Sequence, residues 1–302
     1  MLSAVKALLL IFLLSGQLAS AADFGPEKYA RDGQLILTQF VSAPFPHASR
    51  TNGHRYQADF YPADQHYADS TVALFVPNGF RDGGRVDFVV HFHGWRNTVA
   101  GTLKDYQLIE QLIDSGKNAI LVVPEGPRNA PDSSGGKLEE TNGFKRFIAE
   151  AVATLQQRGL MKNDSTCGDI ILSGHSGGYQ VIAAIVERGG LAVHVKEVWL
   201  FDALYGQAGK FLAWSESTGG RLIDIYTDGG GTKSRTEEMM TALKTQGTKI
   251  LAATDQSAAL EALKTNQFVF LHTDLGHNDV VAKRQAFRRF LETSRLADIR
   301  KD

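Results

Sequence analysis

The chain has 302 residues, of which 43% are hydrophobic and 22% are charged, a balance typical of a globular protein with a full core. This composition argues against a disordered chain. The formal net charge is -1, so no overall field attracts nucleic acid or an anionic membrane surface. We therefore expect no nucleic-acid partner, and any ligand must be inferred from a local site.

The N-terminus has the pattern of a secretory signal peptide. Lys6 precedes an unbroken apolar run at residues 7–14, and the small residues Ala19-Ser20-Ala21 follow. The run is well short of the roughly 20 apolar residues that span a bilayer, so it does not predict a stable membrane anchor. We expect a signal peptide at residues 1–21 and a single exported domain at residues 22–302, periplasmic or extracellular.

The chain has one cysteine, Cys167, so an internal disulfide cannot form and the core must provide the stability. Cys167 comes directly before a predicted buried strand. We expect it to pack as a small apolar side chain.

Apolar runs of strand length alternate with amphipathic helical stretches along most of the chain. The pattern predicts strands at residues 85–92, 118–124, 168–172, 195–201, 222–226 and 267–271. It predicts helices at residues 103–114, 143–158, 177–188, around Phe211, 234–245 and 280–291. Such an order predicts an α/β fold with a mostly parallel central sheet and helices on both faces. Residues 34–77 alternate more strongly, which fits antiparallel strands at one edge, and the role of the segment 249–266 is left open.

One of these strands ends in the sequence Gly174-His175-Ser176-Gly177-Gly178, directly before a predicted helix. In such a sheet, ligands collect beyond the carboxyl ends of the strands. Glycines on either side of a serine allow the sharp strand-to-helix turn that exposes its hydroxyl, known as a nucleophile elbow. A phosphate-binding loop is the alternative, but it usually carries a lysine or a longer glycine pattern. The motif therefore indicates Ser176 as a nucleophile.

A serine hydroxyl needs a histidine base, which a carboxylate holds in orientation. His277 follows the last predicted strand and precedes the final helix, in Asp274-Leu275-Gly276-His277-Asn278. Two aspartates compete for the third position, because Asp202 and Asp228 each follow a predicted strand. We favour Asp228, since its strand is the last main strand before the one that leads to His277, and we keep Asp202 as the alternative acid.

Negative charge that develops on a substrate oxygen needs two N–H donors. The N–H of Gly177 lies at the start of a helix and is the first candidate. The second should come from the loop after an early central strand, where His93-Gly94-Trp95 stands. We therefore expect Gly177 together with Gly94 or Trp95 to form the oxyanion hole, while Trp95 either walls the pocket or simply packs.

These residues resemble those of serine hydrolases with the α/β-hydrolase fold, over a region from about Arg85 to Leu291. The resemblance implies Ser176 as nucleophile, His277 as base, Asp228 or Asp202 as acid, and an acyl-enzyme mechanism without metal or other cofactor. The interval between Asp202 and Leu222 has room for about one helix, so we expect no large cap over the site.

Other polar residues allow competing interpretations. His91 and His93 could meet His175 and His272 in a zinc site, but the oxyanion loop already explains the first pair. Arg128 and Lys137 follow a central strand and could bind a substrate carboxylate, although solvated loop charges are the simpler account. The basic residues at 283–284 and 288–289 are expected on the outer face of the final helix.

The sequence thus predicts an exported carboxylic ester hydrolase acting on a small-molecule or polymeric ester. A peptidase or amidase acting on cell-envelope material is the alternative in the same class, because a triad does not reveal the leaving group. A binding protein that keeps the fold without catalysis is the alternative in another class. Acyl length, natural substrate and oligomeric state have no signal in the sequence.

Overall fold

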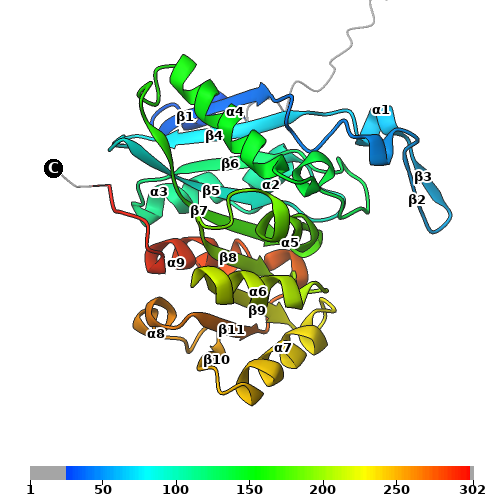
Figure 1. Ribbon diagram of the computed structural model, residues 1–302, viewed down its shortest axis with the longest axis vertical. Helices are drawn as coiled ribbons and strands as arrows, with labels where there is room; N and C mark the ends of the chain where they lie inside the picture. The colour runs from blue at the N-terminus through cyan, green and yellow to red at the C-terminus, as the bar shows by residue number, and fades with distance from the viewer. Residues whose placement is uncertain (1–24, 300–302) are drawn as a thin grey trace, which may run out of the picture.

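The computed structural model describes residues 25–299, which form a nine-stranded sheet with helices on both faces (Figure 1). The predicted signal peptide lies outside the described residues. The strands follow the order β1-β4-β6-β5-β7-β8-β9-β11-β10 across the sheet. Strands β1 and β4 run antiparallel to their neighbours, and all pairs from β6 to β10 are parallel. The prediction of a mostly parallel sheet with an antiparallel edge is confirmed.

The strands of the large sheet are β1 (Gly33–Gln39), β4 (Thr71–Pro77), β5 (Arg85–Phe92), β6 (Ile120–Pro124), β7 (Thr166–His175), β8 (Val195–Phe201), β9 (Arg221–Thr227), β10 (Ile250–Thr254) and β11 (Phe268–Thr273). The α-helices are α1 (Ala63–His66), α2 (Val99–Asp105), α3 (Leu108–Ser115), α4 (Gly143–Gln157), α5 (Tyr179–Arg188), α6 (Ala208–Thr218), α7 (Lys233–Thr245), α8 (Leu260–Thr265) and α9 (Ala286–Thr293).

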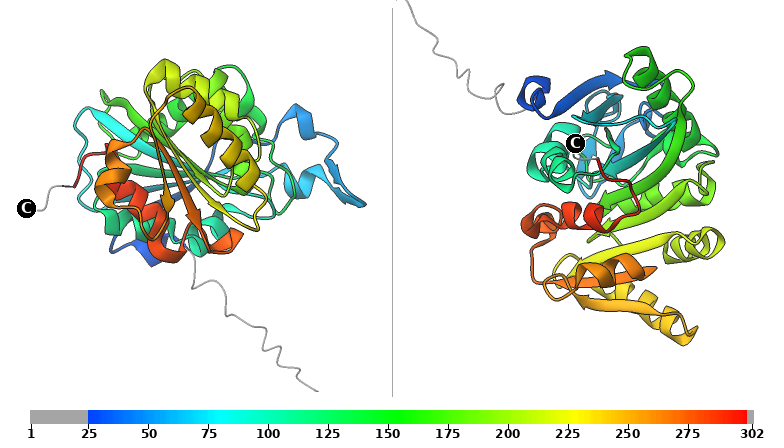
Figure 2. Two further views of the ribbon diagram at one scale, coloured as in Figure 1. Left: turned by 90° about the horizontal axis from the view of Figure 1, so that it is seen from below. Right: turned by 90° about the vertical axis from the view of Figure 1, so that its left-hand side faces the viewer.

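Two apolar cores lie on opposite faces of the sheet. One packs α4, α5, α6 and α7 against it, and the other packs α2, α3, α8 and α9, as the edge-on view in Figure 2 shows. The central strands are apolar on both faces because side chains that alternate along a strand enter both cores. Ile171 and Leu172 of β7, for example, are buried in different clusters. Cys167 packs against the first core, as expected for a small apolar side chain.

Two predicted helices are interrupted by residues with left-handed backbone. The expected helix 103–114 is divided into α2 and α3 at Gln107, whose φ is 51°. The expected helix 280–291 begins only at Ala286, because Arg284 and Gln285 have φ values of 59° and 55°. A left-handed residue cannot continue a right-handed helix. The break before α9 places Arg284 outside that helix, where its side chain meets the loop that precedes His277.

The segment 249–266 provides the outermost strand, β10, which pairs in parallel with β11, and the short helix α8. The hairpin of β2 (His54–Tyr56) and β3 (Asp59–Tyr61) projects from one side of the molecule as an arm beside α1 (Figure 1). Between β8 and β9 the described chain contains α6 alone, so no large cap covers the sheet there, as predicted. Within residues 25–299, no helix has the length and apolar character that a membrane span requires.

Asp224, in the middle of β9, is fully buried and accepts a hydrogen bond from Thr236 at 2.6 Å, while its other oxygen has no partner among the described residues. Burial raises the pKa of Asp224 to about 7 from an ordinary value of 3.8. Between these pH values the folded protein holds a proton that the unfolded chain has released. The free energy of unfolding therefore falls as pH rises through this window.

We expect Asp224→Asn to remove this dependence. The variant should gain stability relative to the wild type as pH rises from about 4 to about 7, by up to roughly 1.4 kcal/mol per pH unit, and hold the gain above that. Urea unfolding of both proteins at several pH values measures the difference. A difference that stays constant from pH 4 to pH 8 would contradict an ionisable buried carboxyl at this position.

Candidate active site

Ser176 stands at the turn between β7 and α5, with a left-handed backbone at a φ of 52°. This strained conformation is rare outside glycine and typical of functional turns. The flanking glycines make the turn possible: a Cβ on Gly178 would lie 2.6 Å from the carbonyl oxygen of Phe92, and one on Gly174 would lie 2.6 Å from Ile182. The elbow predicted from the sequence is therefore present, with Ser176 half-buried at its tip.

His277 lies in the loop after β11, and its imidazole contacts Asp202, the residue after β8. The Nδ1 atom of His277 is 2.6 Å from Oδ2 of Asp202. The carboxylate is buried and the imidazole is partly exposed, with 28% of its side chain accessible. Because Nδ1–H donates to the carboxylate, Nε2 is left as the basic atom of the ring.

The carboxylate of Asp202 has hydrogen bonds on both oxygens besides the one from His277. Thr227 donates to it through its backbone N–H at 3.2 Å and through its hydroxyl at 2.8 Å, and the hydroxyl of Thr232 also donates to it. Burial alone would raise the pKa of Asp202, but the hydrogen bonds from His277, Thr232 and Thr227 hold it below its ordinary value. The group is therefore a stable anion beside the imidazole.

The preference for Asp228 as the partner of His277 is wrong, because the loop after β9 serves the buried acid in another way. Asp228 is exposed and pairs with Lys233 at 2.7 Å and with His272 at 3.2 Å. The same loop packs against Asp202: a Cβ on Gly230 would lie 1.7 Å from Oδ2 of that carboxylate. The loop therefore encloses Asp202 and leaves Asp228 in solvent.

His175, the residue before the nucleophile candidate, ties the elbow to the loop that carries His277. Its Nε2 donates to the backbone oxygen of His277 at 2.9 Å, and its Nδ1 accepts from the hydroxyl of Tyr106 at 2.8 Å. Burial, together with the neighbouring His277, lowers the pKa of His175 to about 4. A neutral ring in one tautomer is what this pair of hydrogen bonds requires. Tyr106, at the break between α2 and α3, is a supporting residue that sequence reasoning missed.

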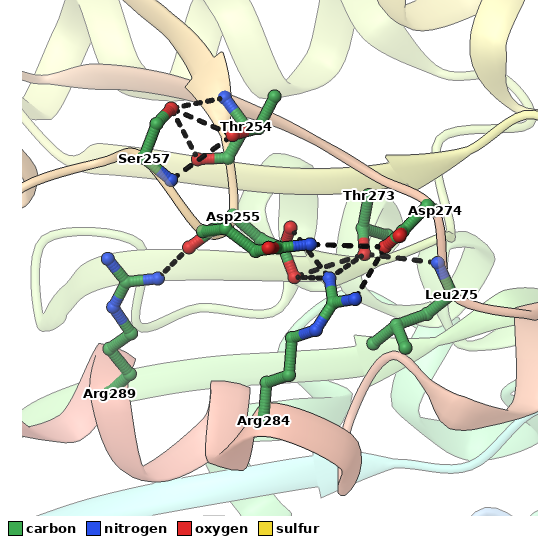
Figure 3. Close-up of polar contacts among 9 residues, drawn as sticks. Thr254, Asp255, Ser257, Thr273, Asp274, Leu275, Arg284 and Arg289 are labelled. Atoms are coloured by element: carbon green, nitrogen blue, oxygen red, sulfur yellow. Dashed lines mark hydrogen bonds and ion pairs between the residues drawn. The ribbon is translucent and has the colours of Figure 1, made fainter.

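The loop before His277 is also held from outside, by a polar cluster that Figure 3 shows. The guanidinium of Arg284 is 2.8 Å from a carboxylate oxygen of Asp255 and 2.6 Å from one of Asp274. Thr273 donates to Asp255 at 3.0 Å and accepts from the N–H of Leu275 at 3.3 Å. Arg284 was expected on the outer face of the final helix; it is exposed, but it precedes α9, and its guanidinium binds this cluster. Arg289 donates to backbone oxygens of the segment 255–258.

Ser176 and His277 line one cavity of about 550 Å³, together with Tyr205 and other polar residues. Among the described residues, the serine hydroxyl forms no direct hydrogen bond with the imidazole. It lies beside Tyr205, whose hydroxyl donates to the backbone oxygen of Gly230 at 2.5 Å. Burial raises the pKa of Tyr205, and the Ser176 hydroxyl partly offsets the rise. In active sites, hydrogen bonds of this kind often form only once the reacting group is bound.

The residues expected to form the oxyanion hole gather around Ser176. A Cβ on Gly94 would lie 2.6 Å from the Cβ of Ser176, so only glycine fits this close approach. Trp95 and Gly177 line a cavity of about 220 Å³ with Ser176, in which Tyr179 and Tyr205 form the other aromatic walls. The indole of Trp95 is 42% exposed and donates to Ser133 at 2.8 Å. Trp95 therefore walls the pocket.

The other histidines weighed for a zinc site have separate partners. His91 bonds Ser173 at 2.9 Å, His93 contacts Glu125 at 3.1 Å, and His272 faces Asp228. Within residues 25–299, no group of three or more histidine, cysteine or acidic side chains is placed to hold a metal ion.

No protein-family model matches the sequence, and no curated protein matches it. Solved structures do match the arrangement of its strands and helices. A feruloyl esterase module from Clostridium thermocellum is 12% identical, with a TM-score of 0.54 over 87% of this chain and 89% of that one. The chain has the α/β-hydrolase fold. A ferulic acid esterase is similar at 12% identity, with a TM-score of 0.51 over 86% of this chain and 99% of the other. At 12% identity, the likeness to these two esterases shows the fold of this chain alone.

The two aspartates provide a matched test of the carboxylate that orients His277. We expect Asp202→Asn to lower kcat for an ester substrate by about 10³- to 10⁴-fold. A neutral amide does not stabilise the imidazolium, and it no longer enforces the tautomer that has its proton on Nδ1. Asp228→Asn, at an exposed ion pair, should change kcat less than about 2-fold. Circular dichroism checks that both variants fold. Equal loss of activity in the two would contradict the assignment.

Proposed function

We propose that the protein is an exported serine hydrolase that cleaves carboxylic esters with Ser176 as nucleophile, His277 as base and Asp202 as acid. One observation carries the proposal: an imidazole held at 2.6 Å by a buried carboxylate shares a cavity with a serine in the left-handed elbow conformation. The strained backbone and the buried charge each reduce the stability of the fold. Residues with a purely structural role would not require the two in the same place.

The reaction begins when the Ser176 hydroxyl turns from Tyr205 toward Nε2 of His277, a side-chain rotation that is fast compared with turnover. As Oγ attacks the ester carbonyl carbon, its proton passes to Nε2 and Asp202 stabilises the imidazolium. The carbonyl oxygen becomes an oxyanion. The N–H of Gly177 and the N–H of Gly94 or Trp95 stabilise it by donating hydrogen bonds.

Collapse of this intermediate breaks the bond to the alcohol, which leaves with the proton from Nε2. Water then donates a proton to Nε2 and attacks the acyl-enzyme carbonyl. A second collapse releases the carboxylic acid and returns the proton to Ser176. Residues of the chain handle each proton, so the sequence of steps calls for no metal or other cofactor.

Esters suit this site for two reasons. The fold neighbours described above are esterases by name, and the cavities beside Ser176 are open, without a cap between β8 and β9 in the described chain. The openness fits either a small ester or a segment of a polyester. An amide or peptide remains the alternative substrate, because the same residues could protonate an amine. Export rests on the sequence pattern of residues 1–21.

A fluorophosphonate probe tests the nucleophile. We expect one covalent adduct per chain, on Ser176, and no adduct in Ser176→Ala, since the probe requires an activated hydroxyl. The same substitution should lower hydrolysis of p-nitrophenyl acetate and butyrate by at least about 10³-fold. Intact-protein mass spectrometry and release of p-nitrophenol measure the two effects.

Ser133→Ala is the control, because this serine lines the 220 Å³ cavity with Ser176 but forms no hydrogen bond with an imidazole among residues 25–299. It should keep both labelling and most of the activity. A wild-type protein that takes no probe while folded would leave the non-catalytic binding protein as the better account. Turnover of a p-nitroanilide at a rate above the matched ester would favour the amidase.

A further inference from the structure

Arg96 is a cation in the cavity of the proposed nucleophile and base. It lines the 550 Å³ space together with Ser176 and His277, and its side chain is exposed. Within residues 25–299, its guanidinium forms no ion pair or hydrogen bond, whereas the arginines at 50, 128, 146, 188, 221, 284 and 288 all pair with carboxylates. A guanidinium is always charged and is a strong partner for a carboxylate or phosphate.

The backbone holds Arg96 in place. Its φ is 57°, a left-handed conformation that is unusual for a long side chain. Its N–H donates to the oxygen of Ala130 at 2.9 Å, and the next residue, Asn97, accepts from the N–H of Asn129 at 2.9 Å. These two hydrogen bonds join the loop after β5 to the loop after β6. The strained residue is therefore fixed on both sides, at the rim of the cavity.

The cations expected at this rim from the sequence are engaged elsewhere. Arg128 pairs with Asp69 at 3.2 Å, and Lys137 donates to the backbone oxygen of Val41 at 2.7 Å. Neither lines a cavity that Ser176 lines. Arg96 is thus the arginine positioned to meet a charged group of the substrate.

The position of His277 indicates which part of the substrate Arg96 would meet. In ester hydrolysis, the protonated base must reach the leaving oxygen, so the alcohol portion lies on the histidine side of the nucleophile. The cavity lined by Arg96 is also lined by His277 and Asn278, whereas the smaller cavity around Ser176 has neither of these two residues in its lining. The 550 Å³ cavity is therefore the one expected to receive the alcohol portion.

We propose, on the basis of the function proposed above, that Arg96 selects esters whose alcohol portion carries a carboxylate or a similar anionic group. Asp105 lines the same cavity and is exposed. Its charge repels an anion and weakens the preference without cancelling it, because a guanidinium can form two directed hydrogen bonds to a carboxylate.

The test compares 4-acetoxybenzoate with neutral 4-acetoxybenzamide, which have leaving groups of the same shape. We expect Arg96→Gln to lower kcat/KM for the benzoate by roughly 10-fold, mainly through KM, and to change the benzamide value less than about 2-fold. Asp105→Asn should raise the benzoate value a few-fold. The wild-type preference for the benzoate should weaken in high salt, since screening acts on an exposed pair.

Arg128→Gln is the matched control and should leave the ratio of the two kcat/KM values unchanged. A ratio that is the same in wild type and Arg96→Gln overturns the inference while leaving the hydrolase intact. A ratio altered by Arg128→Gln instead would also overturn it. A wild-type protein that hydrolyses neither ester and takes no fluorophosphonate would sink the proposed function, and this inference with it.

Discussion

The buried carboxylate of Asp202 is the constraint around which the candidate site is arranged. An uncompensated charge in a protein interior costs several kcal/mol, so every lone pair of this group needs a donor. The donors come from the end of β9 and from the loops after β9 and β11: Thr227 ends the strand, Thr232 lies in the first loop, and His277 lies in the second. Since β8, β9 and β11 are neighbours in the sheet, one charge joins the carboxyl ends of three strands. The hydrogen bond from Nδ1 of His277 to this carboxylate also orients the imidazole.

Two residues with strained backbone lie at the same edge of the sheet. Ser176 after β7 and Asp202 after β8 both have left-handed φ values, of 52° and 46°, and neither is a glycine. Such residues cost about 1 to 3 kcal/mol each and persist only where the surroundings fix them. At Ser176 the packing of Gly94 and Gly178 fixes the turn, and at Asp202 the hydrogen bonds do so. In a continuing strand both side chains would stand roughly perpendicular to the sheet. The left-handed turns redirect them, so that Ser176 lines the cavity and Asp202 meets His277 beneath it.

The sequence was sufficient for the features that depend on local pattern. Apolar runs located the parallel strands, and the glycines around Ser176 identified the elbow, because both effects act within a few residues. The acid depends on tertiary contacts: Asp202 and Asp228 each follow a strand, and only the fold reveals which one Thr227 and Thr232 surround. Tyr106 was missed for the same reason, since its partner is 69 residues away along the chain. The spacing of Thr227 and Gly230 allows the hydrogen bond that shapes the loop around Asp202. A threonine three residues before a glycine is too common a pattern to identify the acid from the sequence.

Contacts on two sides hold His277 and its loop, and together they limit which groups its imidazole can reach. On the inner side, His175 holds its backbone oxygen, and Asp202 holds Nδ1. On the outer side, Arg284 ties Asp274 and Asp255 together and anchors the preceding loop. Since these contacts hold the loop on both sides, Nε2 meets the groups that enter the cavity lined by His277. A serine side chain can rotate about χ1, so in the proposed mechanism alignment depends on movement of the hydroxyl away from Tyr205 and not on movement of the histidine loop.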